Sequence, residues 1–172
     1  MAFELVHPKA LDGNVFSMLD DRWMLVCAGD RTAHNMMTAS WGAFGVLWGT
    51  PVAHCYIRDT RYTFRFTEAQ PYFSLCFFPE SFRSQLNLCG TKSGRDLDKT
   101  AACGFHTAFT EEGVPYFEEA ELVFVCRKLY WHDIDPARFQ DPDIERHYPK
   151  KDYHREYVGE IVKVMRKTEE TT

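Results

Sequence analysis

MTASWGAFGVLWG, residues 37–49, combines hydroxyl side chains, small residues and tryptophans in one short stretch. Thr38 and Ser40 supply the hydroxyls, and Ala39 and Gly42 are small enough to let a ligand lie close to the backbone. Backbone N–H groups that face a ligand, together with hydroxyl donors, suit an anionic or polar group. The stretch therefore predicts a ligand-binding segment.

The two tryptophans of this stretch have different expected places. Trp41 follows the hydroxyl residues and could wall a pocket for a flat aromatic ring. Trp48 could line the same pocket, but it sits next to Val46 and Leu47, a setting more typical of a core residue. We therefore assign Trp41 to the ligand site and Trp48 to the core.

A second segment, IRDTRYTF at residues 57–64, is expected to open a helix. Thr60 is a good N-cap, and Arg61 follows in the first turn. A helix N-terminus offers free N–H donors, so a phosphate there could be held by Arg58 and Arg61. In the alternative, Thr60 only caps the helix and the arginines pair with carboxylates such as Asp59 or Glu68.

A third segment, GTKSGRDLDK at residues 90–99, places Lys92 and Ser93 before an expected helix whose first turn carries Asp96. Lys92 and Ser93 suit a phosphate group. An ordinary capped helix without a ligand explains the same residues equally well. Taken with the first two segments, the pattern indicates a phosphorylated cofactor.

Composition limits the classes of protein that the chain can represent. Its 172 residues are 45% hydrophobic and 15% aromatic, with a formal charge of −5, which fits one globular domain over residues 1–172. A mildly acidic chain does not favour nucleic acid, so basic residues must gather locally to hold an anion.

The chain shows neither a signal peptide at MAFELVHPKALDG nor an apolar run of membrane-spanning length, so we expect a cytoplasmic protein with no membrane partner. Six cysteines are scattered singly, without spacing typical of zinc, and are expected to be buried free thiols in a reducing compartment, with no metal site.

Five segments rich in β-branched or aromatic residues are expected strands, and three shorter segments between them are expected helices. The strands are 23–29, 52–57, 73–78, 122–131 and 156–164, and the helices are 60–69, 79–90 and 94–104. Gly90 and Gly104 are expected to end two of the helices. Many strands with short helices predict a mainly β fold, a barrel with helical insertions. Residues 133–154, polar and punctuated by proline, are expected to form a long ordered loop or flap.

Taken in order, the segments resemble the flavin reductase-like family that binds FMN in a split β-barrel, and in particular its flavoredoxin-like branch. The matching patterns are N-x-M-T-x-S-W-G from Asn35, P-V-x-x-x-Y-I-R-x-x-R-Y-T from Pro51, G-T-K-S-G-R-D-x-D-K from Gly90 and E-E-A-E-L-V from Glu118. The resemblance runs from about Arg22 to Val164, which is most of the chain.

The resemblance implies a six-stranded Greek-key split β-barrel that pairs into a homodimer, with FMN near the dimer interface. By this likeness, Asn35 and the loop Thr38–Ala39–Ser40–Trp41 contact the flavin ring and ribityl chain. Arg58, Thr60, Arg61 and the loop of Lys92 and Ser93 bind the ribityl chain or the phosphate.

One further correspondence concerns His154. NAD(P)H-using flavin reductases often carry a G-D-H-x-x-x-x-G pattern whose histidine faces the nicotinamide. Here DYHREYVG keeps the spacing of His154 and Gly159, while Tyr153 interrupts the pattern. His154 is therefore the candidate catalytic residue, with a solvated loop histidine as the alternative.

Two functions follow from the resemblance. In the first, the chain is an NAD(P)H-dependent flavin reductase or related oxidoreductase that uses FMN to reduce free flavin or another small acceptor. In the second, it is a flavoredoxin-like carrier that passes electrons between redox protein partners without a nicotinamide site. A third reading is an anion-binding barrel that has lost its flavin. The first two leave the redox chemistry to the cofactor, so no protein nucleophile is expected.

Overall fold

Ten strands and four α-helices make up the computed structural model of the chain, which describes residues 2–168. The strands are β1 Phe3–Leu5, β2 Met24–Gly29, β3 His34–Ala39, β4 Gly42–Leu47, β5 Thr50–Arg58, β6 Tyr72–Phe77, β7 Thr107–Phe109, β8 Pro115–Phe117, β9 Leu122–Asp133 and β10 His154–Lys167. The helices are α1 Val15–Ser17, α2 Tyr62–Ala69, α3 Arg83–Thr91 and α4 Lys99–Cys103. All five strands expected from the sequence are present.

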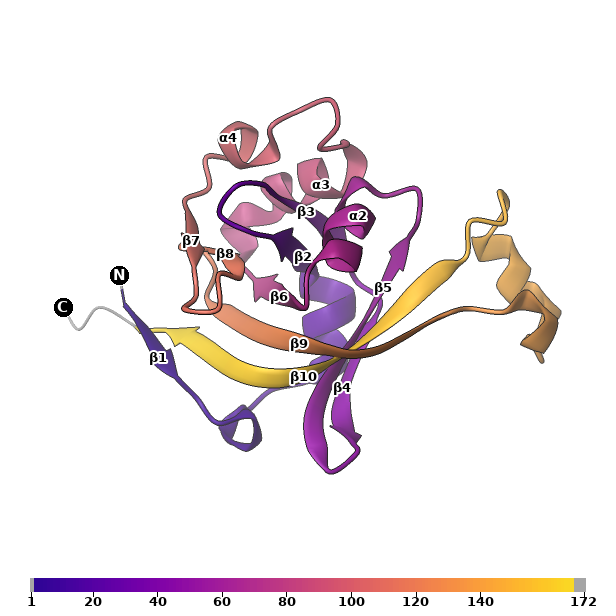
Figure 1. Cartoon of the computed structure of the whole chain (residues 1–172), viewed down its shortest axis with the longest axis horizontal. Coiled ribbons are helices and arrows are strands. Elements are labelled where there is room, and N and C mark those ends of the chain that lie inside the picture. The colour runs from indigo at the N-terminus through magenta and orange to yellow at the C-terminus, as the bar shows by residue number, and fades with distance from the viewer. Residues whose placement is uncertain (1, 169–172) are drawn as a thin grey trace.

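One antiparallel sheet runs in the order β3-β2-β6-β9-β10-β5-β4, with β1 added beside the end of β10 (Figure 1). Strands β3 and β4 follow each other in the chain yet lie at opposite ends of this order. Only Ser40 and Trp41 join them, and two residues span at most about 11 Å between the flanking Cα atoms. The sheet must therefore curl until its two edges approach each other.

Contacts inside the curled sheet show how close the two edges come. A Cβ atom added to Gly42 of β4 would lie 3.1 Å from the side chain of Met24 on β2. The Phe44 ring of β4 lies 4.7 Å from the ring of Phe124 on β9, across the interior. The predicted class, a mainly β split barrel with short helical segments, is confirmed. The sheet has eight strands, whereas the resemblance implied six. The five strands expected from the sequence are joined in it by β1, β3 and β4.

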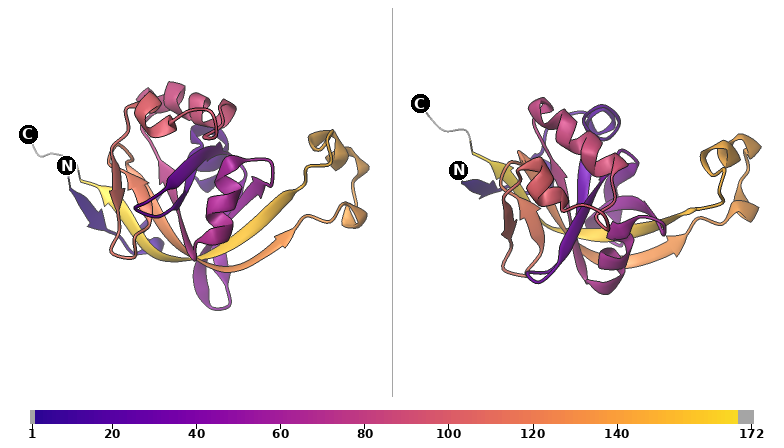
Figure 2. Two further views of the ribbon diagram at one scale, coloured as in Figure 1. Left: turned by 45° about the horizontal axis from the view of Figure 1, so that its top comes forward. Right: turned by 90° about the horizontal axis from the view of Figure 1, so that it is seen from above.

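Strand β2 separates two apolar cores. Its six residues are all buried, because alternate side chains enter opposite cores. Val26 packs inside the barrel with Phe73 and Tyr157, whereas Leu25 packs on the other face with Leu86 of α3 and Phe117 of β8. Helices α2, α3 and α4 gather over the end of the sheet that carries β2 and β3 (Figure 2).

The helix ends differ in part from the sequence expectation. Helix α2 has Arg61 rather than Thr60 at its N-cap, and no side-chain hydrogen bond caps it, because Asp59 and Thr60 form a turn after β5. Gly90 lies inside α3, which continues to Thr91. Gly104 does end α4, with a φ of 67° that suits glycine.

The hairpin of β4 and β5 explains the position of Trp48. Leu47 pairs with Thr50, so Trp48 and Gly49 form a two-residue turn in which both residues have positive φ, 52° and 74°. The turn carries the Trp48 side chain into solvent, where it is 63% exposed. The assignment of Trp48 to the core was therefore wrong.

Strands β9 and β10 continue to one side of the molecule as an arm, in which residues 154–160 of β10 also pair with β5, and residues 134–153 connect the ends of β9 and β10 (Figure 1). Two 3₁₀ turns, Pro136–Arg138 and Pro142–His147, order this connection. Asp135 and Asp141 accept backbone N–H bonds at the start of each turn. The expected ordered loop is confirmed. Across residues 2–168, no helix has both the length and the apolar character needed to cross a membrane.

Gly159 on β10 gives a direct test of the barrel packing. A Cβ atom there would lie 2.7 Å from Cζ of Phe73 and 2.8 Å from Cβ of Cys126, both inside the core. We expect Gly159→Ala to lower the free energy of unfolding by about 1–3 kcal/mol, measured by urea denaturation. Gly45→Ala, on β4 with nothing within 4 Å, is the control and should change it little. Equal effects of the two changes would contradict this packing.

Candidate functional site

The residues singled out in the sequence gather where β5 ends, α2 begins and β10 starts. Arg58, the last residue of β5, is directly opposite His154, the first residue of β10. Three residues further along the chain, Arg61 stands at the N-terminal end of α2. Thus one turn of chain brings two arginines and the candidate histidine together.

Arg58 is already engaged by the 134–153 connection. Its guanidinium forms an ion pair with Asp152 at 2.7 Å and donates a hydrogen bond to the carbonyl of His147 at 2.9 Å. It also lies 5.1 Å from the ring centre of Tyr148. The Asp59 and Glu68 partners considered from the sequence are not the partners observed. Glu68 instead binds Arg155 and Tyr157.

Arg61 has a different environment. It is half-buried and donates to the carbonyl of Cys89 at 3.4 Å, and none of the ion pairs among residues 2–168 involves it. Burial lowers the pKa of Arg61, and the neighbouring Arg58 lowers it further. A guanidinium with one neutral partner and a cation beside it is suited to bind an anion.

Lys99 is a third cation in this region, and the sequence reasoning did not place it in the site. Its side chain is only 3% exposed, and its amine donates to the carbonyls of Met36 at 3.0 Å and Cys89 at 2.8 Å. Burial is the main reason that the pKa of Lys99 falls to about 8, and Arg61 contributes. Lys99 and Arg61 therefore share one acceptor, the carbonyl of Cys89.

The residues around Lys99 permit its burial but do not specify it. The residues that follow it, Thr100–Cys103, are small and partly apolar, so α4 can lie flat against α3 with the lysine between them. A lysine at the first position of such a short helix reads as surface charge unless its burial is known.

Asn35 connects β3 to two of the other segments. Its amide donates to the hydroxyl of Thr63 on α2 at 2.8 Å. A Cβ atom on Gly94 would lie 2.1 Å from Oδ1 of Asn35, so the 92–98 loop packs directly on this side chain and only glycine fits there. Asn35 thus connects β3, α2 and the loop.

The MTASW stretch is the end of β3 with a two-residue link, rather than the loop that we expected. Thr38 and Ala39 belong to β3, and the hydroxyl of Thr38 donates to the carbonyl of Leu86 on α3 at 2.5 Å. Ser40 and Trp41 line a hollow of about 580 Å³ with Tyr56 and Tyr148. The hollow therefore has aromatic walls beside the charged group.

His154 lies at the edge of this hollow. Its ring is 4.9 Å from that of Trp41, and its Nδ1 is 2.9 Å from the hydroxyl of Tyr148. Burial, followed by the charge of Arg58, lowers the pKa of His154 to about 4, although Asp152 opposes the shift. His154 is therefore a buried, neutral imidazole at neutral pH, and the alternative of a solvated loop histidine is wrong.

The remaining candidates, Thr60, Lys92 and Ser93, lie on loops near this group. The backbone carbonyl of Thr60 accepts a bond from Arg95 at 3.2 Å, and Ser93 Oγ accepts one from the N–H of Arg95 at 3.2 Å. Lys92 is exposed at the end of α3. The helix expected over residues 94–104 begins only at Lys99, with Asp98 as its N-cap.

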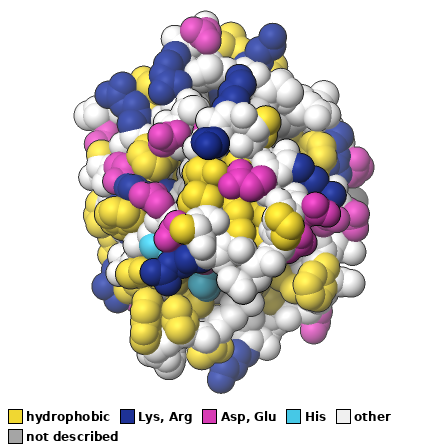
Figure 3. Space-filling model, turned by 90° about the vertical axis from the view of Figure 1, so that its right-hand side faces the viewer, with side chains coloured by type: hydrophobic (Ala, Val, Ile, Leu, Met, Phe, Trp, Pro, Cys, Tyr) yellow, Lys and Arg dark blue, Asp and Glu magenta, His cyan; other side chains and the backbone are white. Residues whose placement is uncertain are grey.

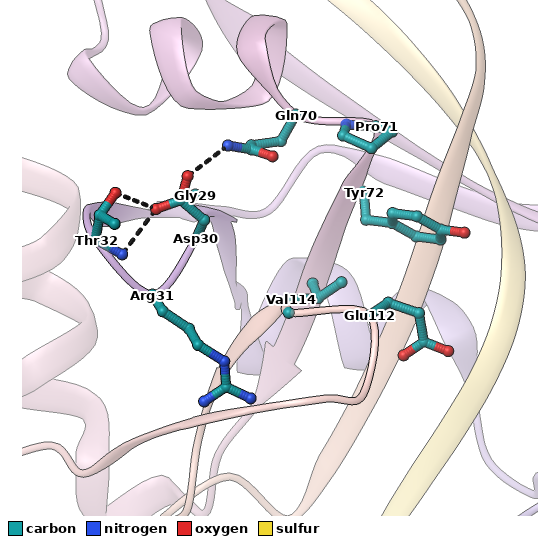
Figure 4. Close-up of a pocket in the computed structure, with 10 residues that line it drawn as sticks. Gly29, Asp30, Arg31, Thr32, Gln70, Pro71, Tyr72, Glu112 and Val114 are labelled. Atoms are coloured by element: carbon teal, nitrogen blue, oxygen red, sulfur yellow. Dashed lines mark hydrogen bonds between the residues drawn. The ribbon is translucent and has the colours of Figure 1, made fainter.

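A separate hollow of about 280 Å³ lies near Asp30, Arg31 and Glu112 and contains none of the predicted residues (Figure 4). Asp30 accepts hydrogen bonds from Thr32 and Gln70, which lower the pKa of its carboxyl. Glu112 pairs with Lys163 at 2.7 Å. The carboxylates here are occupied with structural partners.

Arg58, Arg61 and Lys99 thus converge with only one carboxylate, Asp152, paired to them among residues 2–168. Seen from the arm end, this side of the molecule mixes basic, acidic and apolar side chains (Figure 3). A local excess of positive charge beside an aromatic hollow fits a ligand that has an anionic group and a flat ring.

A split β-barrel with a cationic cluster beside an aromatic hollow is the kind of β-barrel that can hold a small ligand. The chain belongs to the flavin reductase-like domain family, whose model matches residues 19–172. The family expected from the sequence motifs is confirmed. No curated protein matches the sequence.

Several solved structures share the fold. An FMN-binding domain of a flavin reductase-like enzyme from Shewanella baltica has a TM-score of 0.69 at 15% identity, over 96% of this chain and 77% of its own. The FMN-binding protein of Thermus thermophilus has 0.67 at 21% identity, over 94% and 81%. Flavoredoxin of Methanosarcina acetivorans has 0.66 at 21% identity, over 87% and 69%.

The burial of Lys99 predicts a pH dependence of stability. Its folded-state pKa, about 8, is below its ordinary value of 10.5, so between these values the unfolded chain binds more protons. The free energy of unfolding should therefore rise with pH in this window, by at most about 1.4 kcal/mol per pH unit. Urea denaturation of the wild type and of Lys99→Met at pH 7, 8, 9 and 10 measures this. The free energy of unfolding of the wild type minus that of Lys99→Met should become more positive as the pH rises. Lys92→Met, at an exposed lysine, should leave the difference from wild type constant. A constant difference for Lys99→Met as well would contradict the burial of a charged amine.

Proposed function

We propose that the chain binds FMN, with the phosphate at Arg61 and Lys99 and the ring in the hollow beside Trp41. The observation that carries this is the half-buried Arg61, whose one hydrogen-bond acceptor among residues 2–168 is a neutral carbonyl, and which lies beside a second buried cation. A phosphate dianion would offset the mutual repulsion of these groups. An inorganic anion alone would not account for the aromatic hollow, whose Tyr148 ring lies 5.1 Å from the guanidinium of Arg58.

The other candidate residues fit the rest of the cofactor. Ser40 and Trp41 line the hollow. The side chain of Asn35 on β3 contacts the 92–98 loop. The remaining candidates lie in the loops before α2 and after α3: Thr60, Lys92 and Ser93. Bound FMN would supply hydride or single-electron transfer. The residues of the chain bind it, fix its orientation and cover it from water.

Of the two activities, we favour an NAD(P)H-dependent flavin reductase or a related oxidoreductase. The specific observation is His154, a neutral imidazole held by Tyr148 and packed against Trp41 at the edge of the hollow. In that place it can orient a nicotinamide or a small acceptor without adding positive charge. A carrier that receives electrons from a redox protein partner, as flavoredoxin-like proteins are expected to do, is the second candidate.

We also propose that the chain forms a homodimer. The β4–β5 hairpin exposes Val46 at 72% and Trp48 at 63%, and Tyr130 of β9 is 49% exposed with its ring 6.2 Å from that of Trp48. Exposed aromatic and aliphatic side chains that lie together are typical of protein interfaces. A second copy is the partner that the family resemblance implies.

The six cysteines are all buried free thiols. This use of cysteine fits a reducing compartment, and we infer a cytoplasmic location from it.

Arg61 and Arg58 provide the first test of the site. We expect Arg61→Gln to weaken FMN binding by about 10-fold or more, because a charge-assisted bond to phosphate contributes roughly 1.5–3 kcal/mol. Riboflavin, which has no phosphate, should bind as before. Arg58→Gln should have a smaller effect on FMN, since Asp152 already pairs with Arg58. Fluorescence titration with both flavins measures the two affinities.

Arg166→Gln is the matched control, because Arg166 pairs with Glu4 near the other end of β10. It should leave both affinities unchanged. If Arg61→Gln weakens riboflavin as much as FMN, Arg61 does not bind the phosphate.

His154 tests the choice between the two activities. Anaerobic mixing of the FMN-loaded protein with NADH or NADPH should bleach the flavin absorbance of a reductase. We expect His154→Asn to slow this bleaching by about 10-fold or more while FMN stays bound. His7→Asn, in the exposed N-terminal turn, is the control. Stable colour with both nucleotides, but bleaching by dithionite, would favour the carrier.

A further inference from the structure

Two buried thiols face each other where α3 packs against α4, beside the carbonyl that Arg61 and Lys99 share. Cys89 on α3 and Cys103, the last residue of α4, have their sulfur atoms 3.6 Å apart. A disulfide needs about 2.05 Å, so the two sulfurs must approach by roughly 1.5 Å. Helices α3 and α4 already pack against each other, which brings the two side chains together without any rearrangement of the sheet.

The position of this pair in the chain matters as much as its distance. Cys89 and Cys103 are 14 positions apart, and the segment between them contains Lys92, Ser93 and Lys99. The backbone carbonyl of Cys89 also accepts the hydrogen bonds of Arg61 and Lys99. A bond between the two sulfurs would therefore close a ring that includes the loop packed on Asn35. It would also fix the position of the Cys89 carbonyl that accepts from Arg61 and Lys99.

We propose that Cys89 and Cys103 form a reversible dithiol–disulfide pair that locks the 90–102 segment when it is oxidised. The oxidant is a small disulfide of the glutathione class. The thiolate of Cys103 attacks one sulfur of glutathione disulfide, which gives a mixed disulfide and releases one glutathione thiolate. The thiolate of Cys89 then attacks the Cys103 sulfur and releases the second. Two protein thiols thus become one disulfide while one glutathione disulfide becomes two glutathione molecules.

Cys103 is the thiol that reacts first. It is 8% exposed, whereas Cys89 is fully buried. Burial raises the pKa of both thiols, that of Cys89 to about 12, and the amine of Lys99 acts against this rise at each of them. Arg61 also acts against it at Cys89. Since the thiolate is the nucleophile, the reaction is slow at neutral pH and accelerates as the pH rises.

Ring closure would have two consequences. The chain entropy of the unfolded state falls, so the melting temperature Tm of the oxidised form rises, by about 6–12 °C for a ring of this size. The 90–102 segment loses freedom in the folded state, so a ligand held by it dissociates more slowly. The second consequence rests on the proposed FMN site, and the first does not.

The experiment uses the full chain, reduced and then treated with glutathione disulfide at pH 7 and pH 9. Peptide mass mapping without reductant should find the Cys89 and Cys103 peptides linked, with a loss of about 2 Da, faster at pH 9, and restored by dithiothreitol. Tm should rise on oxidation. Release of FMN from the oxidised protein should be several-fold slower than from the reduced protein.

Cys103→Ala should lose the cross-link, the Tm rise and the slower release together, and Cys89→Ala is a second variant with the same expected result. Cys126→Ala, at a buried thiol on β9 outside this pair, is the control and should keep all three. Recovery of glutathione adducts alone, or of a cross-link that leaves Tm unchanged or lower, would overturn the proposal. A cross-link with a higher Tm but no change in FMN release would support the dithiol pair and reject only its link to the flavin.

Discussion

The link of two residues between β3 and β4 is the constraint on which the architecture depends. Because Ser40 and Trp41 must join strands that lie at opposite ends of the sheet order, the sheet has to curl, and its apolar inner face is enclosed. The same link places Trp41 beside the start of β10 and the end of β5. The two-residue link that closes the barrel thus also lines the candidate ligand site. A longer link would loosen both the barrel closure and this side of the site.

The second organising feature is a group of three cations, Arg58, Arg61 and Lys99, that has one paired carboxylate among residues 2–168. Arg58 has a carboxylate partner, whereas Arg61 and Lys99 share a backbone carbonyl. Partly buried cations without a counter-ion reduce stability, and proteins retain such groups chiefly at functional sites. The arrangement fits a chain whose complete electrostatic balance includes a bound anion.

Sequence reasoning succeeded where a local pattern is sufficient. Runs such as FSLCFF and LVFVCRKLYW contain enough apolar and aromatic residues to specify strands without knowledge of their neighbours. The family motifs also brought Arg58 and His154 into one hypothesis, and the structure places them opposite each other.

The reasoning failed where a long-range contact decides the outcome. Strand β4 contains two glycines and is held by its pairing with β5, and the Trp48 side chain is turned outward by a hairpin whose register only that pairing defines. The burial of Lys99 depends on α3, β3 and the carbonyls that they present, none of which is visible in the residues around it.

Strand β2 has a further consequence for the dynamics of the molecule. Its six residues are buried on both faces and hydrogen-bonded on both edges, to β3 and to β6, so its amides have no route to solvent short of opening both cores. Beyond Arg127, by contrast, β9 pairs with β10 alone, and this outer part of β9 carries exposed residues such as Tyr130 and Trp131. In hydrogen–deuterium exchange the molecule would thus divide into a slow unit centred on β2 and a fast unit in the outer part of β9 and the 134–153 connection. One polypeptide would combine a rigid scaffold with a region that can fluctuate without unfolding it.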